Sequence, residues 1–212
     1  EAALNLEAKD EFVYFIEIEG RSEYAVLQSK PISVASTLRN TLFKDTKTVV
    51  CTSATLSTGG NFDFIAGELG CENYSSLIAE SPFDWPNQAM LVLPDDLVDP
   101  SDKENFGNCC AERLAEIVDI AEGRTLALFT SYKNLEIAYA RLKDHPKYTI
   151  LRQGQGGSRT KLIEQFKADK SSVLLGTESF WAGVDVPGDA LSCVVIDRLP
   201  FPTPDDPILD AI

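Results

Sequence analysis

The sequence lacks the segments that bind the phosphates of a nucleotide. The phosphate-loop pattern G-x-x-x-x-G-K-[ST] is absent, and GTESFWAG, which looks similar to it, has no lysine. No Asp-Glu pair follows a predicted strand in the way that a magnesium-holding Walker B segment requires. The dinucleotide pattern G-x-G-x-x-G is also missing. These absences exclude a complete NTPase site within the chain and argue against a dinucleotide-binding domain.

The sequence also lacks membrane and metal signals. No run reaches the roughly 18 apolar residues that span a bilayer, and the acidic start EAALNLEAKDE is unlike a signal peptide, so we expect no membrane contact and a cytoplasmic location. The five cysteines include no Cys-x-x-Cys pair. We therefore predict reduced thiols and no metal site. The only histidine, His145, precedes Pro146 in a polar turn and is not expected to be catalytic.

Charge is distributed unevenly along the chain. The formal net charge is −14, which argues at first against binding to phosphates. Residues 141–170, however, contain eight basic and three acidic side chains, a net charge of +5 that leaves −19 for the remainder. This basic segment is typical of one phosphate-facing surface on an acidic domain, or of a solvated helix face.

Hydrophobic patterning predicts an α/β fold. Residues 12–18 and 24–28 form a predicted hairpin around residues 19–21, followed by a helix through 32–43 and a short strand at 48–51. A helix at 62–69 and a strand at 89–93 come next. Strands and helices then alternate, with strands at 125–129, 148–151, 172–175 and 191–196 and helices at 103–121, 134–142 and 159–166. The alternation predicts a parallel sheet with helices on both faces.

Four polar loops follow predicted strands, and ligands bind such sheets at the carboxyl ends of the strands. These loops are TSATL at 52–56, TSYKN at 130–134, RQGQGG at 152–157 and GTESFWAGVDVPG at 176–188. The last combines glycines, hydroxyl groups and a carboxylate, as phosphate recognition requires, although it can also be a plain connection. The TSY hydroxyls can cap a helix or contact phosphate, and the glycine-rich loop can be a flexible turn or follow a sugar–phosphate chain between Arg152 and Arg159.

The ordered set TSATL, GRTLALFTSYKNL, QG and VLLGTESFWAGVDVPGDALSCVVIDRLPFPTPDDP closely resembles the DinG-like helicases, relatives of XPD in superfamily 2. The resemblance covers nearly the whole chain. It implies the second RecA-like domain of an ATP-dependent 5'-to-3' DNA helicase, in which ATP and Mg²⁺ lie between two motor domains and single-stranded DNA crosses both. The partners that it implies are therefore single-stranded DNA and the first motor domain, and this chain alone would bind neither ATP nor Mg²⁺.

The resemblance also implies roles for individual residues. Motif III, which couples ATP to domain closure, consists of Thr52, Ser53, Ala54 and Thr55. Residues implied to contact DNA are Thr130, Ser131, Tyr132, Arg152, Gln153, Gly154, Arg159, Thr177 and Ser179. Residues implied to act on the nucleotide side are Glu178, Gly183 and Asp185.

Two features depart from the family pattern. Ala182 stands where a glutamate or glutamine is common, and the sequence stops at Ile212, before a motif VI with its arginines. We therefore expect a segment at 1–57 that returns from the first motor domain with motif III, and a second RecA-like domain at 58–212 that is truncated before motif VI. A non-catalytic helicase-like scaffold, or another nucleic-acid-binding module, is the alternative.

Overall fold

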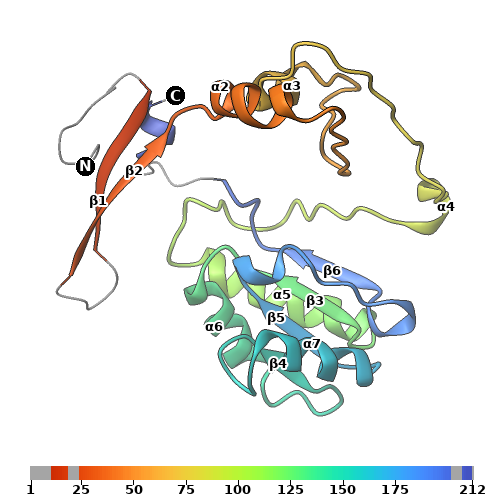
Figure 1. Ribbon diagram of the computed structural model, residues 1–212. Coiled ribbons are helices and arrows are strands. Elements are labelled where there is room, and N and C mark those ends of the chain that lie inside the picture. The colour runs from red at the N-terminus through yellow and green to blue at the C-terminus, as the bar shows by residue number, and fades with distance from the viewer. Residues whose placement is uncertain (1–10, 19–23, 202–206, 212) are drawn as a thin grey trace. The chain divides into compact units, whose positions relative to one another are not determined.

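The computed structural model describes residues 11–18, 24–201 and 207–211. The chain forms two compact units, one from the described parts of Glu1–Met90 and Pro202–Ile212 and the other from Leu91–Phe201. Figure 1 shows the elements of both units. The sequence predicts a boundary after residue 57, between a segment from the first motor domain and the second motor domain. This boundary differs from the division after Met90 between the two compact units, and it stays a prediction.

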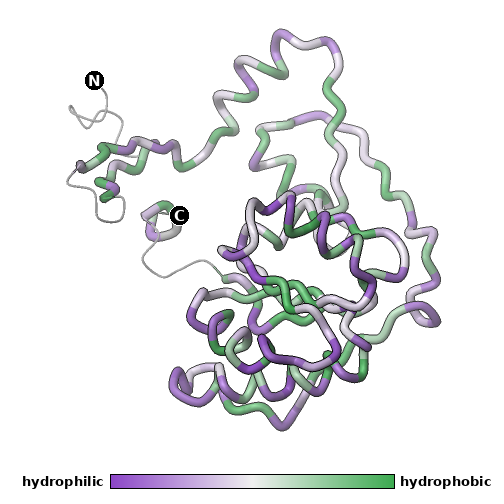
Figure 2. The backbone as a smooth tube through the Cα atoms, turned by 90° about the horizontal axis from the view of Figure 1, so that it is seen from below, coloured by the Kyte–Doolittle hydropathy of each residue, from purple (hydrophilic) through white to green (hydrophobic). Residues whose placement is uncertain are grey.

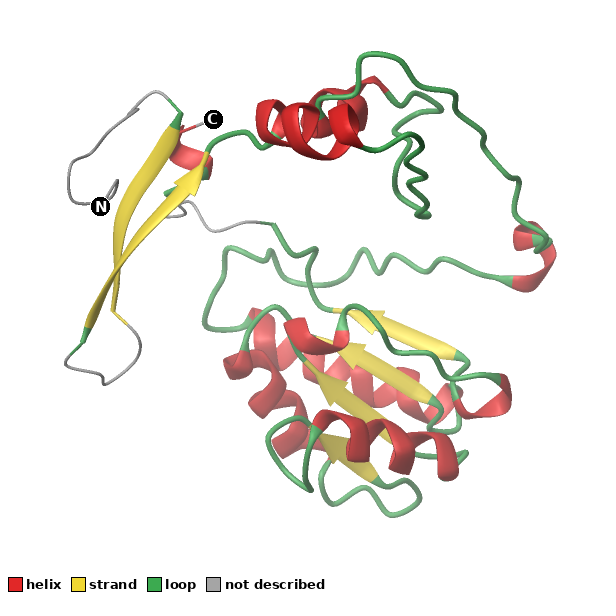
Figure 3. Cartoon of the chain, viewed as in Figure 1, coloured by secondary structure: helices red, strands yellow, loops and turns green. Residues whose placement is uncertain are grey.

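The second unit is built on a four-stranded parallel sheet. Its strands are β3 (Thr125–Leu128), β4 (Ile150–Arg152), β5 (Val173–Gly176) and β6 (Cys193–Ile196), in the order β4-β5-β3-β6. Figure 3 shows all four arrows running the same way. Every residue of β3 and β5 is buried, because the central strands of such a sheet are covered on both faces. The parallel sheet predicted from the sequence is therefore confirmed.

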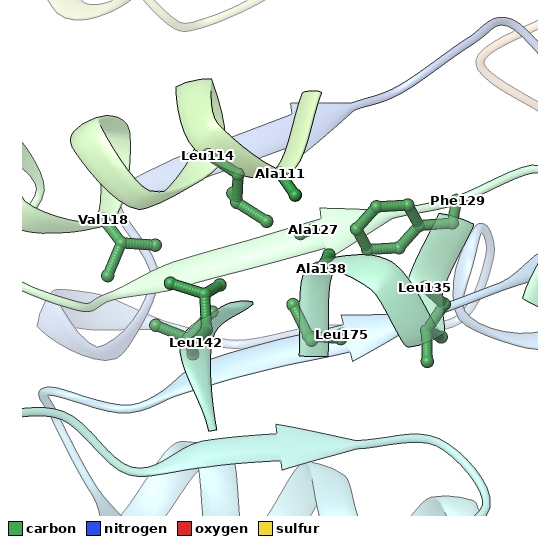
Figure 4. Close-up of a cluster of buried hydrophobic side chains, with 10 residues drawn as sticks. Ala111, Leu114, Val118, Ala127, Phe129, Leu135, Ala138, Leu142 and Leu175 are labelled. Atoms are coloured by element: carbon green, nitrogen blue, oxygen red, sulfur yellow. The ribbon is translucent and has the colours of Figure 1, made fainter. Parts of the chain in front are cut away.

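Helices cover both faces of this sheet, as predicted. Helices α5 (Phe106–Ile120) and α6 (Tyr132–Leu142) pack on one face and α7 (Arg159–Ala168) on the other. Successive strand residues point to opposite faces, so Ala127 packs with the helices α5 and α6 while Leu126 packs with α7. Figure 4 shows the buried side chains between the sheet and helices α5 and α6, and in Figure 2 green, hydrophobic stretches of the backbone lie in the interior of this unit. Two single turns, η2 (Glu178–Phe180) and η3 (Gly188–Ala190), separate β5 from β6.

A tight turn joins α5 to β3 at the amino-terminal edge of the sheet. Its three residues all have positive φ, at 55° for Glu122, 79° for Gly123 and 38° for Arg124. A Cβ on Gly123 would lie 1.9 Å from the carbonyl oxygen of Ser171, so only glycine fits there. The carbonyl of Arg124 accepts hydrogen bonds from the amides of Ser192 and Cys193, which fasten the turn to the start of β6.

The first unit contains the predicted hairpin. Strands β1 (Phe12–Ile18) and β2 (Ala25–Pro31) pair antiparallel, and the expected turn at 19–21 lies outside the described residues. The predicted helix through 32–43 is present as α2 (Ala35–Leu38) and a π-helical turn η1 (Arg39–Phe43). Shorter elements follow, namely α3 (Asp63–Leu69), α4 (Trp85–Gln88) and η4 (Leu209–Ala211).

Two predicted strands are absent from the part of the chain that the structure describes. Residues 48–51 and 89–93 are extended or irregular but pair with no strand, and Val50 and Leu91 are 79% and 84% exposed. An apolar run becomes a strand only where another strand accepts its backbone hydrogen bonds, and the described residues offer none to these segments. The predictions of these two strands were wrong for that reason.

The helices show no membrane-spanning character. None formed by residues 11–18, 24–201 or 207–211 is both long and apolar enough to cross a bilayer. All five cysteines are free thiols.

Candidate functional site

Three of the four predicted loops lie together at the carboxyl-terminal edge of the sheet. They follow β3, β4 and β5, which are adjacent parallel strands, so residues 130–134, 152–157 and 176–188 emerge at the same edge. The fourth loop, 52–56, follows no strand and belongs to the first unit. Its predicted place at this edge depended on the strand at 48–51, which is not formed.

Gln153 links the three loops through its side-chain amide. Its Oε1 accepts hydrogen bonds from the backbone amide and the hydroxyl of Thr177, at 2.7 and 2.9 Å. Its Nε2 donates to the Tyr132 hydroxyl at 2.7 Å. Thr177 is only 6% exposed, so the amide oxygen satisfies a donor that water reaches poorly. Three residues expected to contact DNA thus form one hydrogen-bonded chain across the edge.

The loop after β3 is fixed at the start of α6. Ser131 is the N-cap residue of this helix, and its Oγ accepts from the backbone amide of Asn134 at 3.2 Å. The amide of Thr130 donates to Asp197 Oδ1 at 2.9 Å. The capping reading of the serine is therefore confirmed, and it leaves Tyr132, which is 57% exposed, at the surface of this edge.

Arg159 holds the loop after β5 from the first residue of α7. Its Nε donates to the carbonyl of Ser179 and its terminal nitrogen to that of Ala182, both at 2.7 Å. The guanidinium also lies 5.5 Å from the ring centre of Phe180, which is buried against α7. A single side chain therefore fixes the path of residues 179–182.

Arg152 is used in a similar way on the other face. It forms an ion pair with Glu136 on α6, and its guanidinium lies 4.9 Å from the ring centre of Tyr139. Both arginines that flank the glycine-rich loop therefore use guanidinium nitrogens to bind other groups of the protein. Gly154, between them, has a φ of 83°, the left-handed conformation that glycine accepts most readily.

The residues expected on the nucleotide side lie further along the loop after β5. Glu178, Gly183 and Asp185 are exposed, and Gly183 turns the chain with a φ of 66°. Within the described part of the chain, the Asp185 carboxylate has no hydrogen bond or ion pair. Asp185 is thus free to meet a ligand or another domain.

The residues that the resemblance assigns to motif III lie in the first unit. Thr52, Ser53, Ala54 and Thr55 are all exposed, and the first three line a cleft of about 1220 Å³ bounded by residues 39–79. The Ser53 Oγ lies 3.1 Å from the Thr55 hydroxyl and accepts from the Thr55 amide at 3.2 Å. These contacts form a local turn that presents hydroxyl groups at the cleft.

The sequence analysis missed Asp197 at the end of β6. Its carboxylate accepts hydrogen bonds from the segment after β3. Burial raises the pKa of the Cys110 thiol on α5 to about 11, and the negative charge of Asp197 raises it to a lesser degree. The rule that picked out the other loops, a polar side chain directly after a strand, would have found it. His145 packs on Tyr148 with ring centres 4.8 Å apart, as a structural residue does.

The residues described by the structure include no group of three or more histidine, cysteine or acidic side chains placed to hold a metal ion.

Comparison with known proteins agrees with this architecture. Residues 114–212 match the model of the helicase C-terminal domain. The chain is 40% identical to the ATP-dependent DNA helicase YoaA of Haemophilus influenzae, over 91% of the chain and 30% of that protein. It is 41% identical to the ATP-dependent helicase DinG of Mycobacterium tuberculosis, over 90% of the chain and 29% of that protein.

A further relative is the 3'-5' exonuclease DinG of Bacillus subtilis, at 32% identity over 94% of the chain and 22% of that protein. The chain thus spans about 30% of the length of the first two relatives. Its parallel sheet, its loops and these matches agree on one assignment. The chain carries a helicase C-terminal domain and is similar, over about 90% of its length, to DinG- and YoaA-type helicases.

Proposed function

We propose that the chain supplies the second motor domain of a cytoplasmic ATP-dependent 5'-to-3' DNA helicase. In this proposal the carboxyl-terminal edge of the sheet contacts single-stranded DNA, and the exposed part of the loop after β5 forms one wall of the ATP cleft. The first motor domain of the same protein supplies the opposite wall, and the motif III residues Thr52, Ser53, Ala54 and Thr55 couple the two.

The observation that carries the proposal is the chain of hydrogen bonds from Tyr132 through Gln153 to Thr177. It joins polar loops from three neighbouring strands, and tyrosine, glutamine and threonine side chains are among those that contact the phosphates and sugars of nucleic acids. Ser131, Gly154 and Ser179 lie in the same loops and add hydroxyl and amide donors. Arg152 and Arg159 add positive charge nearby, although their closest contacts hold the loops in place.

The chain's own residues fit only a part of an ATP site. Gly183 allows close approach of the backbone, and Asp185 and Glu178 offer exposed carboxylates that can orient a water or a Mg²⁺-bound nucleotide. No lysine of a phosphate loop is present in the sequence, so the phosphates and the Mg²⁺ would be held mainly by the first motor domain.

Asp185 provides the test in the full-length protein. We expect Asp185→Ala to lower the rate of DNA-stimulated ATP hydrolysis at least about tenfold, because a group aligned in the closed state acts mainly on turnover. Its thermal stability should change little, since an exposed loop carboxylate contributes little to folding. Asp189→Ala is the matched control, because Asp189 lies in the same connection between β5 and β6, its side chain is 81% exposed, and it makes only a 3.7 Å contact with Lys170.

Unwinding is measured in parallel on forks with a 5' or a 3' single-stranded tail. Preference for the 5' tail, with a loss in Asp185→Ala and not in Asp189→Ala, supports the proposal. Equal unwinding by the two variants would remove Asp185 from the ATP cleft, and a 3' preference would overturn the polarity.

A non-catalytic helicase-like scaffold is the second candidate. It is favoured by the relative from Bacillus subtilis that is named a 3'-5' exonuclease, in which the matched region is 22% of the protein. In that case the full-length protein would bind single-stranded DNA without hydrolysing ATP. The hydrolysis measurement above separates the two candidates directly.

A further inference from the structure

Asp197 is held at the site edge by its own strand. It directly follows β6, which pairs in parallel with β3, so the two strands end side by side (Figure 3). The backbone amide of Asp197 donates to the carbonyl of Leu128 at 3.1 Å and extends this ladder by one bond. The pairing of β6 with β3 therefore fixes the position of the Asp197 backbone, from which the carboxylate extends.

Both oxygens of the Asp197 carboxylate bind the segment after β3. Oδ1 accepts from the backbone amide of Thr130 at 2.9 Å, and Oδ2 accepts from Asn134 Nδ2 at 3.0 Å. The two contacts lie on either side of Ser131 and Tyr132. One carboxylate thus holds the residue before α6 and the first turn of the helix, which includes Tyr132.

The carboxylate is unsuited to direct contact with DNA. It has the same sign as a phosphate, it is only partly exposed, and its two oxygens already accept hydrogen bonds. Its influence on the surface must therefore pass through the residues that it holds. The path continues from Tyr132 to Gln153 and Thr177, so that all four strand ends are joined.

We propose that Asp197 is a positioning residue for nucleic acid, which fixes the Thr130–Tyr132 segment against β6 so that the edge is formed before DNA arrives. The proposal rests on the proposed function of that edge. Without the carboxylate, the Thr130 amide and the Asn134 side chain lose their acceptors. The segment then has to be ordered when DNA binds, and this ordering lowers affinity.

The test compares variants of the full-length protein by affinity for a single-stranded oligonucleotide and by hydrogen exchange. We expect Asp197→Ala to speed exchange at the Thr130 amide, to raise the Kd for DNA about tenfold, and to leave turnover at saturating DNA within about twofold. Exchange at Leu126 and Leu174, in the buried strands, should stay unchanged and serves as the control for folding.

A reciprocal exchange provides the rescue. In the double variant Asn134→Asp with Asp197→Asn, the amide and the carboxylate trade places, so an acceptor for Thr130 and a side-chain hydrogen bond both remain. We expect it to recover most of the DNA affinity, whereas Asn134→Asp alone, which places two carboxylates face to face, should bind DNA more weakly. A double variant no better than Asp197→Ala would overturn the positioning role.

Parallel measurements on Tyr132→Ala and Gln153→Ala separate this proposal from the proposed function. If they weaken DNA binding while Asp197→Ala does not, the edge binds DNA and only the role of Asp197 is wrong. If neither they nor Asp197→Ala changes affinity, the edge does not bind DNA and both proposals fail.

Discussion

Replacing Gln153 tests whether the three loops form one surface. Gln153→Ala removes the acceptor of the Thr177 amide, which lies in a residue only 6% exposed. An unsatisfied buried donor costs about 1–3 kcal/mol. Since a factor of ten corresponds to about 1.4 kcal/mol, hydrogen exchange at Thr177 should become between about fivefold and about 140-fold faster where local opening controls exchange. The affinity of the full-length protein for single-stranded DNA should fall with it.

Gln153→Glu separates loop support from contact with DNA. The carboxylate still accepts from Thr177, and the Tyr132 hydroxyl can turn to donate to it, so exchange at Thr177 should stay near the wild-type rate. The added negative charge should nevertheless weaken binding at low salt, and this deficit should shrink as salt screens it. Unchanged exchange in Gln153→Ala would refute the bridging role, and normal DNA affinity in Gln153→Glu would place Gln153 away from the phosphates.

Three further predictions follow from the charge, the thiols and the missing motifs. Lys161→Gln, at the start of α7 near the loop edge, should reduce DNA affinity several-fold and lower the salt slope by about one, while Lys167→Gln, in the last turn, makes the same charge change at the far edge and should have little effect. The pKa of Cys110, raised to about 11 mainly by burial, should make its reaction with a disulfide reagent at pH 8 about a hundredfold slower than in the urea-unfolded protein, and equal rates would contradict this burial. The 212-residue chain alone should show no ATP hydrolysis above background, and DNA-stimulated turnover by it would refute the view that the phosphate-binding half lies elsewhere.

The sheet could be predicted from the sequence because its strands are short, continuous apolar runs between amphipathic helices. Thr125–Leu128 and Val173–Gly176 are buried on both faces, and such segments have few alternatives to a central parallel strand. The runs at 48–51 and 89–93 look much the same in sequence. They are not strands here, because pairing depends on a neighbour that the local sequence does not specify.

The positions of the site loops could be predicted, but their contacts could not. Parallel strands bring Ser131, Gln153 and Thr177 to one edge once their order in the sheet is known. That Gln153 bonds Thr177 rather than pointing to solvent depends on strand register and on the side chain's reach. Arg159 illustrates the same limit, since a basic side chain beside glycines suggests a phosphate contact, whereas its donors bind the carbonyls of Ser179 and Ala182.

The turn at Glu122, Gly123 and Arg124 divides the consequences of mutation between the two edges of the sheet. Its two non-glycine residues in the left-handed conformation each cost about 1–2 kcal/mol, which only an intact set of hydrogen bonds to β6 and α5 can offset. When heating breaks those hydrogen bonds, the strain favours unfolding from the amino-terminal edge of the sheet, which carries no site residue. We therefore expect temperature-sensitive alleles of the whole protein to map to this turn, and alleles that separate DNA binding from stability to map to the opposite edge.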